Sequence, residues 1–239
     1  MNEKENKSKI AEEITSDTIS EKKSTEKILT INQTEQYQTI DEMIKKSRAG
    51  SVYYTLLVIS SFIIAPGLIL GNASVVIGGM LVTPVLTPLL AFALGISIWH
   101  FNIIKDTFIL LIKSFFVVLV VSFLMGLIFG QPQNIFFSNN PFVIIFLYFI
   151  IAVASGVAAT FAWARKEISE VLPGVSIAVS LAPPLSLVGI WLSSFDYEIT
   201  KFYFLVFIFN LLGIILGSIA VFSLLRFYKV EKRLEDKIM

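Results

Sequence analysis

The stretch that decides the fold is IGGMLVTPVLTPLL, Ile77 to Leu90, an apolar run that contains Pro84 and Pro88. The run is long enough to form a buried helix. A proline in a helix interior removes a backbone hydrogen bond and clashes with the preceding turn, which costs about 3 kcal/mol. Two such prolines in so short a stretch therefore require a structural reason.

The surrounding sequence has the composition of an integral membrane protein. Of its 239 residues 55% are hydrophobic and only 15% are charged, and the mean hydropathy is +0.78. A soluble domain averages about 25% charged residues. The absence of cysteine excludes disulfides and thiolate metal sites. Because a charged leader precedes the first apolar run, that run is expected to be a membrane anchor and not a cleaved signal peptide.

The apolar runs predict an all-α membrane domain over residues 51–226. A helix needs about 20 apolar residues to cross the hydrocarbon core of a bilayer. By this measure about six transmembrane helices are expected, near Val52–Leu70, Ala73–Ile98, Thr107–Phe129, Phe142–Ala164, Val171–Leu192 and Phe202–Leu225.

The segments outside this domain differ in character. Residues 1–34 are rich in Lys, Glu, Ser and Thr, which predicts a disordered cytoplasmic tail. Residues 35–50 place apolar side chains on one helical face, which predicts an amphipathic juxtamembrane helix. This helix either lies on the membrane surface or extends the first span. Residues 227–239 are expected to form a C-terminal tail.

The basic residues predict the orientation in the cell membrane. Lysine and arginine gather on the cytoplasmic side of membrane proteins. Basic residues flank the first span, lie in the loops after the second and fourth spans, and follow the last span. With both termini cytoplasmic these clusters share one side, and only Lys201 lies outside.

Two stretches resemble each other and predict an internal repeat. They are VVIGGMLVTPVLTPLLAFALGIS (Val75–Ser97) and VLPGVSIAVSLAPPLSLVGIWLS (Val171–Ser193), each the middle span of a group of three. The repeats would cover about 51–130 and 141–226. Because three is odd, the second copy must enter the membrane from the opposite face. This is the 3+3 inverted repeat found in many transporters.

The prolines of the two middle spans, the second and the fifth, predict breaks at matching places. Freed backbone groups that faced lipid would each cost several kcal/mol, so a break is tolerated only where protein or a wet cavity satisfies it. A site is therefore expected between the broken spans. The alternative for each proline is a simple kink, Asn72 can instead cap a helix, and Asn210 can join helices or line the site. The candidate residues are Thr83, Pro84, Thr87, Pro88, Ser176, Ser180, Pro183, Pro184, Ser186, Asn72 and Asn210.

The same two boxes resemble a known family. GNASVVIGGMLVTPVLTPLLAFALG and LPGVSIAVSLAPPLSLVGIWL are similar to the paired proline-containing boxes of an uncharacterised hydrophobic-domain family of prokaryotic membrane proteins, a domain of unknown function. The resemblance covers about Tyr53 to Phe222, and Gly79 replaces the family's usual alanine. It implies a membrane architecture but no substrate.

The available chemistry favours transport over catalysis. No Asp or Glu falls inside a predicted span and there is one histidine, His100, so neither an enzyme nor a metal site is expected. No cofactor and no nucleic acid are expected. The preferred interpretation is a secondary transporter or channel-like permease for a small ion or solute. The alternatives are a non-transporting scaffold or sensor and a lipid-moving protein. The partners would be the lipid bilayer, the solute and, through small-residue helix faces, a second copy of the chain.

Overall fold

The described part of the protein is entirely helical. The computed structural model describes residues 33–47, 50–132, 140–164 and 181–227. The predicted tails therefore lie almost wholly outside the described residues. The helices within these residues are α2 (Gln33–Lys46), α3 (Ser51–Ile69), α4 (Ala73–Val82), α5 (Leu86–Ser97), α6 (Phe101–Phe129), α7 (Pro141–Ala164), α9 (Ala182–Leu192) and α10 (Tyr197–Leu224).

The helices of the described ranges account for four or five membrane spans. By length and composition α3, α6, α7 and α10 can each cross a membrane. Helices α4 and α5 together make a further span that bends by 58° at its break. Helix α9 is apolar but shorter, and the first half of the predicted span Val171–Leu192 lies outside the described residues. The chain is thus a multi-pass membrane protein.

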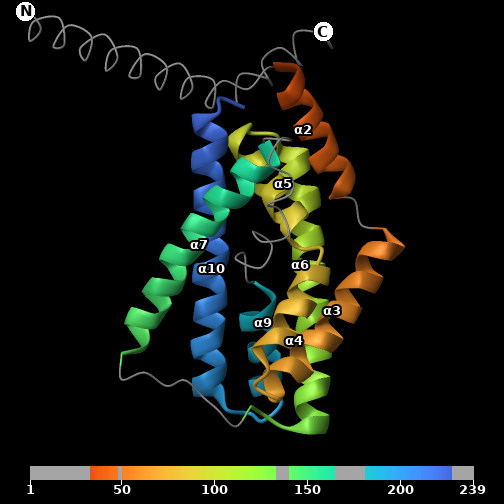
Figure 1. Cartoon of the computed structure of the whole chain (residues 1–239), viewed down its shortest axis with the longest axis vertical. Coiled ribbons are helices and arrows are strands. Elements are labelled where there is room, and N and C mark those ends of the chain that lie inside the picture. Colours follow the sequence, from red (N-terminus) through yellow and green to blue (C-terminus); the bar gives the residue numbers. More distant parts are fainter. Residues whose placement is uncertain (1–32, 48–49, 133–139, 165–180, 228–239) are drawn as a thin grey trace, which may run out of the picture.

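The two longest helices, α6 and α10, run in opposite directions along the bundle (Figure 1). Helix α7 packs along α10, and α3 packs against α6 and α4. Helix α9 contacts α6, α10 and α3, and α5 contacts α6 and α10. We call the end that holds α2, the α5–α6 turn and the last residues of α10 the basic end. The other end, with the α3–α4 and α9–α10 turns, is the opposite end.

Helices α6 and α10 begin earlier than predicted, at Phe101 and Tyr197. The charges in the first two turns of each helix suggested loops, but a helix can continue beyond the hydrocarbon core. At a rise of 1.5 Å per residue α6 is about 43 Å long, against a core of about 30 Å. The turns that precede the two helices are short, and each contains a residue with positive φ, Trp99 at 55° and Phe195 at 57°.

Helix α2 is separate from α3 and packs on the protein. Met43 is fully buried in the same core cluster as Leu89 of α5. The side-chain amide of Gln36 donates a hydrogen bond to the carbonyl oxygen of Leu225, which follows the last turn of α10, at 3.0 Å. Helix α2 is therefore attached both to α5 and to the end of α10.

Glycines allow close contact between α7 and α10. A methyl group added at Gly156 would overlap the carbonyl oxygen of Ile214, and one added at Gly217 would overlap that of Val153. Gly126 of α6 similarly lies against Ile190 of α9. Small residues at such spacing let helix backbones approach closely. These glycines serve packing within the chain.

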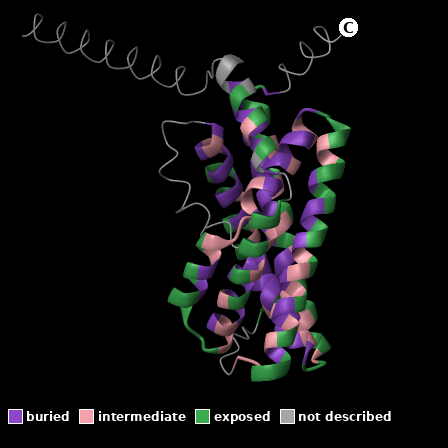
Figure 2. Cartoon of the chain, turned by 90° about the vertical axis from the view of Figure 1, so that its right-hand side faces the viewer, coloured by how far each residue is buried: buried purple, intermediate pink, exposed green. Residues whose placement is uncertain are grey.

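Large apolar side chains cover the outer faces of the long helices. Figure 2 shows exposed residues along the outside of the bundle and buried residues between the helices. The exposed residues include Ile112, Phe116, Leu127, Phe146, Ile150, Leu212 and Leu216. In water such a surface would be unfavourable. It is suited to contact with lipid chains.

One buried hydrogen bond joins the first span to the third. The hydroxyls of Tyr53 and Ser114 lie 2.7 Å apart, and Ser114 also donates to the Leu110 carbonyl oxygen. Tyr53→Phe is expected to destabilise the protein by about 1 kcal/mol, because Ser114 keeps its backbone partner. This corresponds to a fall of about 2–4 °C in melting temperature. Tyr54→Phe, at the partly buried neighbour, is the control, and an equal fall in both variants would contradict the assignment.

Candidate functional site

The predicted break in the second span is present at residues 83–85. Thr83 is extended, with φ −69° and ψ 120°. A residue that precedes proline is disfavoured in the helical region, so Pro84 explains this conformation. The Thr83 hydroxyl donates to the carbonyl oxygen of Gly79 at 3.1 Å. The side chain thus satisfies one carbonyl group at the end of α4.

The other prolines of the two boxes stand in first turns. Pro88 is the third residue of α5, and Pro183 and Pro184 are the second and third residues of α9. The first four N–H groups of a helix have no partner within it. Proline in this turn loses no helical hydrogen bond and removes a donor that would be costly to bury. The penalty of an interior proline therefore does not apply, and these prolines let a helix begin inside the apolar bundle.

Helices α5 and α9 point their N-termini toward the middle of the bundle. Figure 1 shows α5 running from the middle to the basic end and α9 running from the middle to the opposite end. With 12 and 11 residues, they are about 18 and 16 Å long, about half of a hydrocarbon core. Their N-cap residues, Val85 and Leu181, make no side-chain cap. The positive ends of both helix dipoles therefore face the interior.

A constant interval of 96 residues relates the two parts of the chain. It separates the first residues of α5 and α9, Leu86 and Ala182, and the first residues of α6 and α10, Phe101 and Tyr197. It also separates two pairs of residues with positive φ, Trp99 and Phe195, and Gly130 and Arg226. The two sequence boxes align at the same interval.

A large cavity lies between α7, α9, α10 and the α3–α4 hairpin. It comprises two adjoining spaces of about 530 and 560 Å³. The residues that line both spaces are Leu68, Tyr148, Pro183, Leu187 and Tyr203. We call the combined space the opposite-end cavity, because it extends from α9 toward Asn72 and Pro132 at that end.

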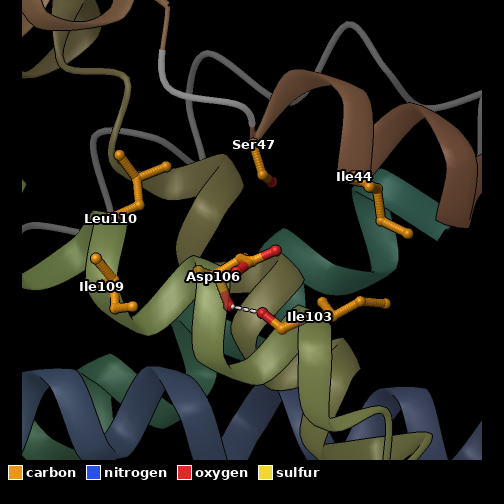
Figure 3. A pocket seen from close by; sticks show the side chains of 7 residues that line it. Ile44, Ser47, Ile103, Asp106, Ile109 and Leu110 are labelled. Carbon is orange, nitrogen blue, oxygen red and sulfur yellow. Dashed lines mark hydrogen bonds between the residues drawn. The ribbon is translucent and has the colours of Figure 1, made fainter.

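A smaller cavity of about 330 Å³ lies at the basic end between α2 and α6. Figure 3 shows Ile44 and Ser47 on one side of it and Asp106 and Ile103 on the other. From α6, Asp106, Thr107 and Leu110 line this cavity, and from α10, Phe202, Tyr203 and Val206 line the opposite-end cavity. Taken in order, the three residues of α6 and the three residues of α10 form pairs that are again 96 residues apart. Equivalent positions of the two long helices thus border cavities at opposite ends.

The structure separates the predicted site residues into groups. Asn72, Pro183 and Pro184 line the opposite-end cavity. The side chain of Asn72 also caps α4 by accepting a hydrogen bond from the Val75 amide at 3.2 Å. Thr83, Pro84, Thr87 and Pro88 lie at or just after the first break, Ser186 and Asn210 are buried within α9 and α10, and Ser176 and Ser180 lie outside the described residues.

Four aromatic residues of the opposite-end cavity were not among the predicted site residues. They are Tyr148 of α7, Trp191 of α9, and Phe202 and Tyr203 of α10. Tyrosine and tryptophan are common at membrane interfaces, so no special role was predicted for Tyr148, Trp191 or Tyr203. One signal was available for Trp191: it follows Pro183 and Leu187 at intervals of four, which places all three on one helical face.

Comparisons with known proteins identify the family of the chain and leave its function open. A family model described as "Domain of unknown function (DUF389)" matches residues 80–216. An uncharacterized protein of Methanocaldococcus jannaschii, MJ0678, is 24% identical over 172 residues, which are 70% of this chain and 52% of that protein. The chain thus spans about half the length of this curated relative. No solved structure matches the chain. Since the family model covers more than half of the sequence, from α4 into α10, the chain belongs to the DUF389 family, whose function is unknown.

Proposed function

We propose that this protein is a secondary transporter or channel-like permease for a small ion or solute. The observation that carries the proposal is the arrangement of α5 and α9. Each begins near the middle of the bundle with proline in its first turn, and the two run to opposite ends. Discontinuous helices that meet near the bilayer midplane are typical of transporter substrate sites.

A 3+3 inverted repeat explains this arrangement. Helix α5 packs on α6 of its own half and on α10 of the other, while α9 packs on α10 of its own half and on α6 of the other. The reciprocal contacts, the 96-residue interval and the opposite directions of α6 and α10 all support a two-fold axis in the membrane plane. The second proposed break, before Pro183, would complete the pair.

The helix dipoles at the centre of the bundle favour solutes with an anionic group. Both half-helices direct the positive ends of their dipoles inward, and half-helix N-termini stabilise anionic groups in such sites. The hydroxyls of Thr83, Thr87, Ser176, Ser180 and Ser186 and the amide of Asn210 are proposed to line the path.

The two cavities fit alternating access. They border equivalent positions of α6 and α10 but differ in size, about 330 Å³ at the basic end and about 530 Å³ beside α10. If one half of the bundle rocked against the other, the larger cavity would form at the basic end and the smaller one at the opposite end. Lys45 of α2, Lys105 near the start of α6 and Arg226 after α10 belong to segments at the basic end, whereas Lys201 belongs to the start of α10 at the opposite end. We therefore propose that the basic end faces the cytoplasm.

Flux through purified protein in liposomes tests this function. We expect uptake of at least one member of a panel of inorganic ions and organic acids, bases and neutral solutes. Thr83→Ala and Ser180→Ala, which remove proposed path hydroxyls, should alter that uptake severalfold. Absence of flux across the whole panel would favour a scaffold or sensor, and exchange of lipid headgroups between leaflets without solute flux would favour a lipid-moving protein. Either result would overturn the permease proposal.

A further inference from the structure

We propose that the opposite-end cavity is a binding site for an amphipathic organic solute with a hydrogen-bond acceptor, such as a carboxylate, and that Tyr148 and Tyr203 hold the acceptor. Its two spaces, about 530 and 560 Å³, are in the range of small-molecule sites. Transport of the bound molecule rests on the permease function proposed above, whereas its binding does not.

The lining explains why the solute is organic and largely apolar. Carbon-rich side chains from several helices make most of the wall, including Leu68, Leu187 and Val206. A small hydrated ion would lose its water against this wall without replacement ligands, at a large cost in free energy. An aromatic or aliphatic body would instead bury apolar surface, which is favourable.

The polar groups of the cavity explain why the solute carries an acceptor. The hydroxyls of Tyr148 and Tyr203, the amide of Asn72 and the indole of Trp191 all belong to lining residues. The Asn72 side-chain oxygen already accepts from the Val75 amide, which leaves its NH₂ group as a donor. The indole Nε1 is a donor only, and it has no hydrogen-bond partner among the described residues although Trp191 is 93% buried. The set is rich in donors.

Charge selects against cations. Among the described residues that line the cavity, none carries a charge, so a cation would meet no carboxylate. The N-terminus of α9 lies at the same cavity through Pro183 and Pro184, and its dipole repels cations and attracts anions. An acidic solute is therefore preferred over a basic one of equal size.

The two tyrosines are the specificity-determining residues of this site. Both line both spaces, Tyr148 from α7 and Tyr203 from α10. A solute that contacts both hydroxyls lies against α9, directly beside the first-turn prolines. This position lies beside the first turn of α9.

Three probes of equal size and different charge test the site: benzoate, benzyl alcohol and benzylammonium. The protein is placed in nanodiscs in a Trp99→Phe, Trp163→Phe background, so that Trp191 is the remaining tryptophan of the three in the chain. We expect benzoate to change the Trp191 emission saturably, with an affinity at least tenfold above that of benzylammonium and with benzyl alcohol between them. Dialysis of radiolabelled benzoate against the wild-type protein and against empty nanodiscs gives a second measurement that does not depend on the tryptophan replacements.

Tyr148→Phe and Tyr203→Phe should each weaken benzoate binding about tenfold, because a hydrogen bond to a charged group is lost. The control is Tyr197→Phe, since Tyr197 is 67% exposed at the start of α10 and does not line the cavity. Equal affinity for all three probes, or unchanged benzoate binding in both cavity variants, would overturn the proposal. Benzoate binding without any solute flux would support this binding site and contradict the permease function. Solute flux without a change in Trp191 emission and without retained benzoate would support the permease function and contradict this binding site.

Discussion

Gly217→Ala is expected to lower the melting temperature of the purified protein by about 2–12 °C. The added methyl group would overlap the Val153 carbonyl oxygen, which belongs to a helix backbone and cannot rotate away. Overpacking of this kind costs about 1–3 kcal/mol, and each kcal/mol lowers the melting temperature of a protein of this size by about 2–4 °C. Thermal unfolding in detergent, followed by size-exclusion chromatography, measures the change.

Gly78→Ala is the matched control for that substitution. Gly78 lies on an exposed face of α4, and nothing is within 4 Å of the position its methyl group would take. Alanine favours a helix over glycine by about 1 kcal/mol, so the melting temperature should stay the same or rise. Equal decreases in the two variants would show that the α7–α10 contact is not the cause.

The second large effect is expected at the first break. Pro84→Ala restores an N–H group and frees Thr83 to adopt helical backbone angles. Helices α4 and α5 can then join across the 58° bend, which would remove the N-terminus of α5 from the interior. In a protein that transports, we expect flux in liposomes to fall at least tenfold. The melting temperature should not rise, because Pro88, now in the first turn of α5, would become an interior proline of the joined helix.

Pro66→Ala controls for the loss of a proline as such. Pro66 lies inside α3, where the helix continues through it. Its replacement restores a helical hydrogen bond without joining two helices, so flux should remain within about twofold. If Pro84→Ala retained full flux, the discontinuity between α4 and α5 would have no part in transport.

The spans were predictable because their signal is local. The composition alone locates α3 and α7 to within one residue at either end. The starts of α6 and α10 were missed because the charges near each start suggested loops. The tight turns at Trp99 and Phe195 were also not expected, since positive φ is uncommon for aromatic residues. The matched spacing of the prolines was also recognised from the sequence. Their place in the first turns of α5 and α9 was not, since it depends on where each helix begins.

The site was only partly predictable because it depends on tertiary packing. Pro183, Pro184 and Asn72 were recognised from motif and position. Tyr148 and Tyr203 are brought to one cavity by the packing of α7 on α10, which requires Gly156 and Gly217 to fit against the facing backbones. No local pattern in the chain contains that information.

The first-turn prolines of α9 have a consequence for which sequences this fold can accept. At positions 183 and 184 the useful property is a missing backbone proton, and every other genetically encoded amino acid supplies that proton whatever its side chain. Every replacement of these prolines should therefore be destabilising to a similar degree, whether the new residue is alanine or leucine. At Pro184 the same rule would hold in any related sequence that keeps a helix starting inside the membrane.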